Sequence, residues 1–343
     1  MTRSTASREG QPVVAVNPTN PDNFVFVSTR FHPLPELEPV GVCFLTYTLD
    51  RGITWNNVTA DYPLGAAPKC GEPQVFADAN GTFYLLNNQL SKSFDGGKTW
   101  SVPSVTPLHM QGATKLRVDV ATGKVYANSA SSWKYPAAVS VSSDGGETWA
   151  AFNQIPGPVD VCLDYQIPDL PPICNLVANG TGPMLAKSGI GLPSDPTPWL
   201  SADPTSTGRF ALMVPRDFTL EIYITDTAGQ NFTGPAVIQT HDAQRPAFDF
   251  GPDGQLGVMW RTNSSGILDV YSTVSFDGGR NFAAPIKVTA QPQPVGQNGQ
   301  PGDRASSVSL TNTYAYVAWS DGRDGLLDAV LAEIPLDLFQ TMS

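Results

Sequence analysis

The sequence is short of charge, above all of positive charge, and it has no long apolar run. Charged residues make up 15% of its 343 positions, and 31 Asp and Glu against 20 Lys and Arg give a formal net charge of −11. This balance argues against binding to nucleic acid or to anionic membrane surfaces. No apolar segment approaches the length of a membrane span. Residues 1–10 lack an apolar core, so we expect any secretion signal to have been removed or never to have been present.

Histidine and cysteine are scarce, which weakens the case for a metal site. The three histidines stand in separate predicted loops without a spacing typical of metal ligands, and the cysteines fit no usual zinc pattern. We therefore predict no metal and no other cofactor. These residues are His32, His109, His241, Cys43, Cys70, Cys162 and Cys174.

The cysteines and the N-x-[ST] sequons together favour a secreted glycoprotein. Cys162 and Cys174 flank a short proline-rich segment, as expected for a local disulfide. Cys43 and Cys70 fall in repeat units that are predicted neighbours. Sequons begin in predicted turns or loops, and an even number of cysteines is typical of an oxidising compartment. The sequon residues are Asn57, Asn80, Asn179, Asn231 and Asn263.

Glycine and proline, by contrast, are abundant, with 31 of each, as in turn-rich all-β proteins. Among the turns, an octet of the form Ser-x-Asp-Gly-Gly-x-Thr-Trp recurs. Good copies occupy 48–55, 93–100, 142–149 and 275–282, and a worn copy occupies 225–232. Steps of roughly 45 to 50 residues, with one longer gap, indicate a repeat architecture.

The octet has a simple physical interpretation. Its Asp carboxylate accepts N–H groups of its own turn, its glycines take positive φ, and its last aromatic ring packs between neighbouring sheets. It resembles the Asp box, or BNR repeat, of sialidase-like β-propellers. In that family the box joins the two outer strands of a blade on the face away from the active site. The resemblance therefore implies an all-β propeller in which the octets are scaffold.

The spacing predicts six units and hence a six-bladed β-propeller. One repeat array uses nearly the whole chain, so residues 1–343 are expected to form one domain. A proline-rich insertion at about 151–198 separates units three and four. Radial closure would leave only short, protected sheet edges. The inner strands are predicted near residues 12–17, 73–77, 115–120, 199–203, 246–251 and 305–310.

In this architecture the functional face holds the loops that lead into each inner strand and those that join the second and third strands. These loops hold 10 of the 20 cations but only 8 of the 31 carboxylates, as well as all three histidines. An acidic protein that gathers positive charge around one mouth would attract an anionic ligand. Alternatively, the arginines tie neighbouring blades together. The cations are Arg8, Arg30, Lys69, Lys115, Lys134, Arg216, Arg245, Arg261, Arg304 and Arg323, and the carboxylates are Glu9, Glu72, Asp195, Asp217, Asp242, Asp303, Asp321 and Asp324.

We take four of these residues as catalytic candidates. Hydrolysis of a sugar needs two carboxylates across the pocket, and Glu72, Asp242 and Asp303 are the best placed. Elimination from a uronate would use His241 as base while an arginine neutralises the carboxylate. The candidate ligand contacts are Arg8, Arg30, Lys115, Trp133, Tyr135, Arg216, Arg245, Arg261, Arg304 and Arg323.

Trp260 and Trp319 recur in register, which favours blade packing over ligand stacking. True sialidase activity is not expected. The F/Y-R-I-P motif of that family is absent, since Thr29–Pro33 does not match it, and no Tyr–Glu pair can be placed.

The leading hypothesis is a secreted enzyme whose central funnel acts on an anionic ligand, such as a carbohydrate, as a glycoside hydrolase or lyase. A second hypothesis is a secondary-metabolism cyclase, such as a hetero-Diels–Alderase, on the same scaffold. A third is a sugar-binding module without catalysis. The expected partner is a small molecule or carbohydrate, with no nucleic acid and no membrane.

Overall fold

The computed structural model describes residues 8–31, 41–58, 73–86, 89–101, 104–105, 115–118, 125–129, 138–148, 150–151, 160–163, 173–176, 199–206, 209–215, 218–226, 233–241, 243–264, 267–291, 293–294, 306–323 and 327–340. This part of the chain is almost entirely β, and its single helix is the four-residue α1 (Asp337–Gln340). No described helix has the length and apolarity that crossing a bilayer requires.

The strands form antiparallel sheets in chain order, which we number 1 to 6, and one separate hairpin. Sheet 1 contains β1 (Arg8–Asn17), β2 (Asn20–Phe31), β3 (Gly41–Thr48) and β4 (Asn56–Asn57), and sheet 2 contains β5 (Gln74–Ala77), β6 (Phe83–Leu86), β7 (Gln89–Ser93) and β8 (Ser104–Val105). Sheet 3 contains β9 (Lys115–Val118), β10 (Val125–Ser129), β11 (Ala138–Ser142) and β12 (Ala150–Ala151).

Sheet 4 contains β15 (Trp199–Ala202), β16 (Phe210–Pro215), β17 (Thr219–Thr225) and β18 (Thr233–Gln239). Sheet 5 contains β19 (Gln244–Phe250), β20 (Leu256–Ser264), β21 (Ile267–Ser275), β22 (Ile286–Lys287) and β23 (Gln293–Pro294), and sheet 6 contains β24 (Ser307–Leu310), β25 (Tyr314–Asp321) and β26 (Asp328–Pro335). The hairpin is β13 (Asp160–Leu163) with β14 (Ile173–Leu176).

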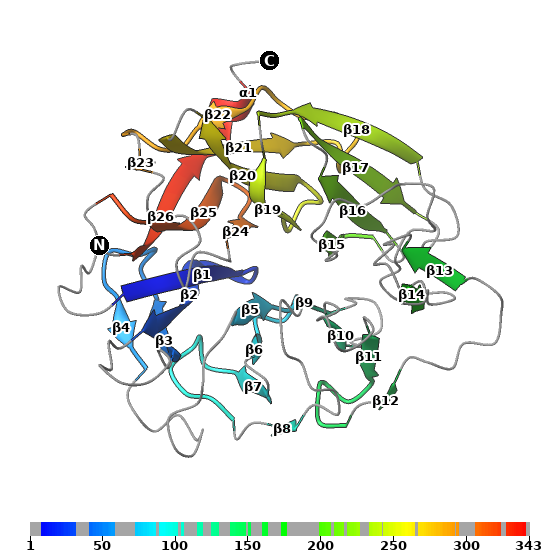
Figure 1. Ribbon diagram of the computed structural model, residues 1–343. Coiled ribbons are helices and arrows are strands. Elements are labelled where there is room, and N and C mark those ends of the chain that lie inside the picture. Colours follow the sequence, from blue (N-terminus) through cyan, green and yellow to red (C-terminus); the bar gives the residue numbers. More distant parts are fainter. Residues whose placement is uncertain are drawn as a thin grey trace, which may run out of the picture.

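The six sheets are arranged around a central axis (Figure 1). Their first strands contact one another in the order β1, β5, β9, β15, β19, β24, and β24 contacts β1 again. Among the described strands no hydrogen-bonded sheet closes the ring, and neighbouring first strands are joined by packing and by a few cross-sheet bonds. The N–H of Val14 on β1, for example, donates to the hydroxyl of Ser307 on β24 at 3.1 Å.

Strand register places the octets and the predicted functional loops at opposite ends of the sheets. In sheet 1, Arg8 at the start of β1 pairs with Phe31 at the end of β2, which pairs with Gly41 at the start of β3. The octet follows Thr48 at the far end of β3. We call the first end the mouth end and the second the octet end.

Each well-preserved octet folds as the sequence predicts. In the second copy, the Ser93 hydroxyl donates to Asp95 Oδ1 at 2.9 Å and accepts the Gly97 N–H at 2.8 Å. Asp95 also accepts the Thr99 N–H at 2.9 Å and the Thr99 hydroxyl at 2.6 Å. The same bonds recur in the copies that begin at Thr48, Ser142 and Ser275, with Asn281 in place of the threonine in the last. A carboxylate that accepts several donors of its own turn fixes the turn.

These bonds favour the ionised carboxylate. In the first and third copies, the hydroxyl of the threonine four residues on, followed by its N–H, lowers the pKa of Asp50 and Asp144. For Asp95, burial raises the pKa, but the hydrogen bonds from Thr99 and Ser93 outweigh it and the net pKa is lowered.

The octet turns also dock on the sheet that precedes them. Gly96 and Gly97 have φ of 79° and 94°. The Gly96 carbonyl accepts a bond from the Asn23 side chain of sheet 1 at 2.9 Å. A Cβ on Gly97 would lie 2.5 Å from the Val25 side chain, so only glycine fits there. Arg51 of the first octet reaches sheet 6, where it pairs with Glu333 at 2.8 Å and stacks on Tyr314 at 3.6 Å.

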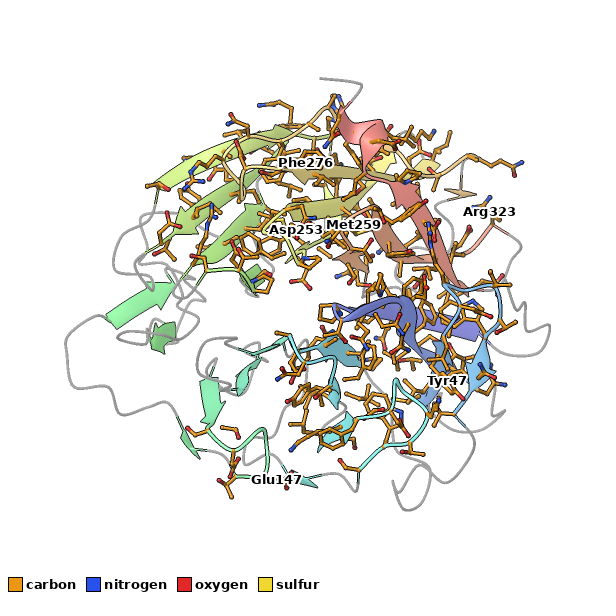
Figure 2. The ribbon with its side chains drawn as sticks, turned by 180° about the vertical axis from the view of Figure 1, so that it is seen from behind. Tyr47, Glu147, Asp253, Met259, Phe276 and Arg323 are labelled. Atoms are coloured by element: carbon orange, nitrogen blue, oxygen red, sulfur yellow. The ribbon has the colours of Figure 1, made fainter. Side chains whose placement is uncertain are left out.

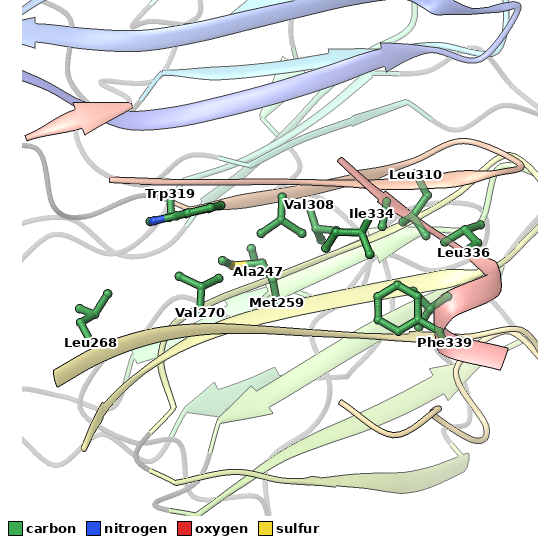
Figure 3. Packing of buried hydrophobic residues seen from close by; sticks show 13 residues of the cluster. Ala247, Met259, Leu268, Val270, Val308, Leu310, Trp319, Ile334, Leu336 and Phe339 are labelled. Atoms are coloured by element: carbon green, nitrogen blue, oxygen red, sulfur yellow. The ribbon is translucent and has the colours of Figure 1, made fainter. Parts of the chain in front are cut away.

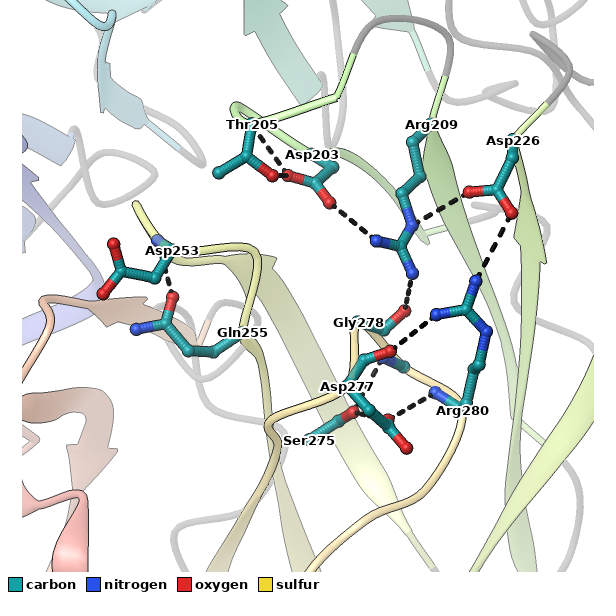
Figure 4. Close-up of polar contacts among 11 residues, drawn as sticks. Asp203, Thr205, Arg209, Asp226, Asp253, Gln255, Ser275, Asp277, Gly278 and Arg280 are labelled. Carbon is teal, nitrogen blue, oxygen red and sulfur yellow. Dashed lines mark hydrogen bonds and ion pairs between the residues drawn. The ribbon is translucent and has the colours of Figure 1, made fainter.

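The octet of sheet 5 docks on sheet 4 through an arginine (Figure 4). Arg209 donates to the Gly278 carbonyl at 3.1 Å and pairs with Asp203 at 3.3 Å and with Asp226 at 3.1 Å. Asp226 belongs to the worn octet copy and also pairs with Arg280 at 3.5 Å. The displaced carboxylate of that copy thus binds two arginines, one on its own sheet and one on the next.

Apolar clusters fill the spaces between neighbouring sheets, and the terminal octet aromatics pack into them. Trp55 packs against the cluster of sheets 1 and 6, and Trp100 against that of sheets 1 and 2. Trp260 and Trp319 are 2% and 3% exposed within such clusters, which confirms their predicted packing role. Figure 3 shows Trp319 beside Ala247 and Val308, between sheets 5 and 6.

The predicted insertion interrupts the chain but not the ring, because β15 contacts β9 directly. Its first residue, Ala151, pairs with Ser140 and completes sheet 3. Within it, Cys162 and Cys174 are directly opposed in the β13–β14 hairpin. None of the cysteines whose side chains the structure describes is free.

We expect Asp95→Ala to lower the free energy of unfolding by about 1 kcal/mol, because the turn loses its acceptor while water replaces part of the lost bonding. Thermal unfolding at pH 7 measures this, with the exposed Asp22→Ala as matched control. Since the folded pKa of Asp95 is lowered, its contribution is full above the unfolded value near 4 and is lost only as the pH falls through the folded pKa. A difference between Asp95→Asn and wild type that already disappears between pH 7 and 5 would contradict this.

We expect Cys162 and Cys174 to form a disulfide, because opposed positions of an antiparallel pair lie within bridging distance. Closing this short loop stabilises the hairpin by about 2–3 kcal/mol. Peptide mapping of the non-reduced protein should recover the linked pair, and free thiols at both positions would rule it out.

Candidate functional site at the mouth end

The described candidate residues all lie at or beside the mouth end. Arg8 and Lys115 are the first residues of β1 and β9, and Arg245 is the second residue of β19. Arg30 and Arg261 lie near the ends of β2 and β20. His241 precedes β19, and Arg323 follows β25. Strand register places Arg30 close to Arg8 along sheet 1 and Arg261 close to Arg245 along sheet 5, because Arg30 pairs with Glu9 and Arg261 pairs with Gln244. The remaining candidates, Glu72, Asp242, Asp303, Arg304, Trp133, Tyr135 and Arg216, lie outside the described residues.

Two of the described arginines contact residues of their own sheets, and a third is buried. The Arg30 guanidinium lies 3.8 Å above the Phe44 ring of the neighbouring strand. Arg323 forms a two-nitrogen ion pair with Asp321, and its N–H donates to the same carboxylate at 3.0 Å. Arg261 is 1% exposed. For these three, the geometry favours the structural alternative that the sequence left open, because a stacked, ion-paired or buried guanidinium has less surface for a ligand.

Arg245 is held differently. It is half-buried in a β-bulge between Gln244 and Ala247 and has φ of 49°, a conformation that non-glycine residues rarely take. Bulges of this kind re-aim a side chain and are frequent beside active sites. A strained backbone at one arginine of the inner circle is the clearest local sign of function in the described residues.

Gln11 occupies the matching place on β1, in the bulge between Gly10 and Val13, with φ of 55°. Its side-chain oxygen accepts the Thr29 hydroxyl at 2.7 Å, and its N–H donates to the hydroxyl of Ser320 on sheet 6 at 3.3 Å. Gln11 and Arg245 each precede a proline, and so does Glu72 before sheet 2. We did not single out Gln11 from the sequence, although this shared X-Pro pattern was the signal that could have found it.

A second overlooked residue lies on the rim between sheets 4 and 5. Phe218, in the connection between β16 and β17, is 67% exposed. Its carbonyl accepts the Thr240 N–H at 2.7 Å, so Phe218 and the exposed His241 belong to touching loops. An exposed ring beside an imidazole, a few residues from Arg245, can stack on a flat or cyclic ligand. Its signal in the sequence was a phenylalanine directly after Arg216 and Asp217 in a predicted mouth loop.

The mouth thus combines an arginine aimed by a bulge, an exposed imidazole and an exposed aromatic ring. Figure 2 shows from behind that Met259 lies within sheet 5 and that Arg323 lies at the edge of sheet 6. Among the described residues, no group of three or more His, Cys, Asp or Glu side chains is arranged to hold a metal. Arginine and aromatic groups suit recognition of an anionic cyclic molecule.

Comparison with known proteins finds solved structures of similar fold. No family model and no curated protein matches the sequence. Among solved structures, the chain is similar to a protein of unknown function from Dyadobacter fermentans, with a TM-score of 0.57 and 12% identity over 98% of this chain and 96% of that one. It is also similar to the Hadza microbial sialidase Hz136, with a TM-score of 0.58 and 13% identity over 97% of this chain but 66% of that one.

A third similar structure is the α-L-arabinofuranosidase Arb93A of Fusarium graminearum in complex with an iminosugar inhibitor, with a TM-score of 0.55 and 13% identity over 98% of this chain and 95% of that one. The chain thus shares the β-propeller fold of these structures. At this level of identity the likeness extends to the fold and not to the residues of the site.

We expect Arg245→Gly to keep or slightly raise the melting temperature, because glycine takes a φ near 49° without strain. The matched control is Arg280→Gly, at an exposed octet position whose ion pair with Asp226 would be lost. Scanning calorimetry measures both. A lower melting temperature for Arg245→Gly would show that the side chain serves as a tie between sheets.

Proposed function

We propose that the chain is a secreted, six-bladed β-propeller enzyme that acts on an anionic carbohydrate at its mouth end, as a glycoside hydrolase or lyase. The observation that carries the proposal is Arg245, a strained arginine of the inner circle in a mouth whose loops hold half of the cations of an acidic protein. An arginine fork binds a carboxylate through two parallel bonds. The circle of first strands from β1 to β24 and back supports six blades.

The proposal is also supported by the fold, because several structures of similar fold are named as enzymes that act on sugars. The similar structures include a sialidase, an arabinofuranosidase bound to an iminosugar, and an arabinanase of Penicillium chrysogenum in complex with arabinobiose. This favours a carbohydrate ligand, whereas the positive mouth favours an acidic one.

In this proposal the substrate would lie between Glu72, ahead of sheet 2, and Arg245 of sheet 5. Sheets 2 and 5 are three places apart in the circle. Glu72 directly precedes Pro73, just ahead of β5, and Arg245 directly precedes Pro246 near the start of β19. Arg245 would bind the sugar carboxylate, and Phe218 would stack on the ring. In hydrolysis Glu72 would pair with Asp242 or Asp303 as acid and base or nucleophile. In elimination His241 would remove the proton next to the carboxylate that Arg245 neutralises.

The proposal is tested by incubating the protein with digalacturonate, sialyllactose and neutral arabinobiose. Chromatography of the products separates the two chemistries, because a lyase leaves an unsaturated uronate that absorbs ultraviolet light and a hydrolase does not. Binding of digalacturonate without turnover would instead support a sugar-binding module. Turnover of arabinobiose alone would contradict the anionic substrate.

We expect Arg245→Lys to reduce activity or affinity for the acidic sugar about tenfold, because one charge-assisted bond of the fork is lost. The melting temperature should stay within about 1 °C of wild type. Arg280→Lys, the same substitution at the octet end, is the matched control and should leave the affinity unchanged. A loss of stability without a loss of affinity would contradict the ligand role of Arg245.

A further inference from the structure

A cleft of about 390 Å³ lies between sheets 1 and 6, away from the central axis. Sheets 1 to 5 each have a fourth strand, whereas the described part of sheet 6 ends at β26. The cleft opens where that outer strand would lie, between β26 on one side and β2, β3 and β4 on the other. Figure 1 shows β26 beside β3 and β4 near the start of the chain.

One wall of the cleft is aromatic. Phe26, Phe44 and Trp55 line it and are each half-buried, and the rings of Phe26 and Trp55 meet edge to face with centroids 6.1 Å apart. Rings that are half-exposed inside a cleft offer flat apolar surface, as required for stacking against the C–H face of a sugar.

The polar lining is acidic on balance. It holds two guanidiniums, Arg51 and Arg323, and three carboxylates, Asp321, Asp328 and Glu333. Both guanidiniums are already paired, with Glu333 and Asp321 respectively. This balance disfavours an anionic occupant, in contrast to the anionic ligand proposed for the mouth.

The rim of the cleft holds the acceptor residue of a glycosylation sequon. Asn57, of the sequon Asn57-Val58-Thr59, lines the cleft and is exposed. It pairs directly with Thr46, which also lines the cleft, so both side chains lie on the same face of sheet 1. Trp55, two residues before Asn57, shares that face.

From these observations we propose that Asn57 carries an N-linked glycan whose first N-acetylglucosamine packs into the cleft against Trp55 and Phe26. The sugar is neutral, one face of its ring is apolar, and its hydroxyl and acetamido groups can bond to the charged rim. The cavity falls in the size range of small-molecule sites. The glycan covers the cleft beside β26, the last described strand of sheet 6.

The modification requires the secretory pathway, and so it shares with the proposed function only the assumption of secretion. The donor is a polyprenyl-diphosphate-linked oligosaccharide. The Asn57 amide nitrogen bonds to the anomeric carbon and loses one proton, while the carbon–oxygen bond to the diphosphate breaks and the polyprenyl diphosphate leaves with the electron pair. Addition is read by mass and does not depend on enzymatic activity.

The test compares protein secreted by a eukaryotic host with protein made in the bacterial cytoplasm. Peptide mass mapping should find a glycan at Asn57 in the secreted protein, absent from Thr59→Ala and retained in Asn56→Gln. Release by peptide N-glycosidase should be at least tenfold slower from the native than from the denatured protein. Asn80, exposed in the turn after β5 and outside the cleft, is the reference site and should show no such protection.

Thermal unfolding provides the second readout. Secreted Thr59→Ala should melt about 2 °C below secreted wild type, because the packed sugar is lost. The same two proteins made in bacteria should melt together, which separates the sugar from any effect of the substitution. An unmodified Asn57 would overturn the proposal. So would a glycan that is released as readily from native protein as the one at Asn80.

Discussion

Docking of each octet turn on the preceding sheet is the constraint on which the rest of this structure depends. The carboxylate of Asp95 holds its own turn rigid, and the rigid turn presents glycine carbonyls and close-packing glycines to sheet 1. The same contact is made by Gly278 on Arg209 of sheet 4. The first and last sheets are not consecutive in the chain. There the octet of sheet 1 docks on sheet 6 through Arg51, which contacts Glu333 and Tyr314. Neighbouring sheets are thus held together both by the apolar clusters between them and by the polar contacts of the octet turns.

This division leaves the opposite end free for function. At the octet end nearly every described polar group is bound within its turn, so there is little left to recognise a ligand. At the mouth end the inner strands begin in bulges that carry Gln11 and Arg245, and exposed side chains such as Phe218 and His241 stand on the rim. The lateral cleft lies apart from both ends, between sheets 1 and 6.

Much of the fold could be predicted from the sequence, because the octet is a local motif whose geometry depends on residues within eight positions. The turn bonds of Asp95 and the packing of Trp260 and Trp319 followed from residue type and period alone. The site was harder to predict, because side-chain contacts across strands are not local. Arg30, Arg261 and Arg323 could not be separated from Arg245 in the sequence, and only register, burial and ion pairing show that the first three are engaged within their sheets. The register shift between Gly10 and Val13 also reveals the bulge that holds Gln11, which the sequence alone does not show.

Hydrogen–deuterium exchange with and without saturating trigalacturonate tests most directly the central claim that the two ends divide scaffold from function. The account predicts slower exchange in peptides that cover 8–12 and 216–245, with no change in the octets at 93–100 and 275–282. Slower exchange confined to the octets, with an unchanged mouth end, would contradict it.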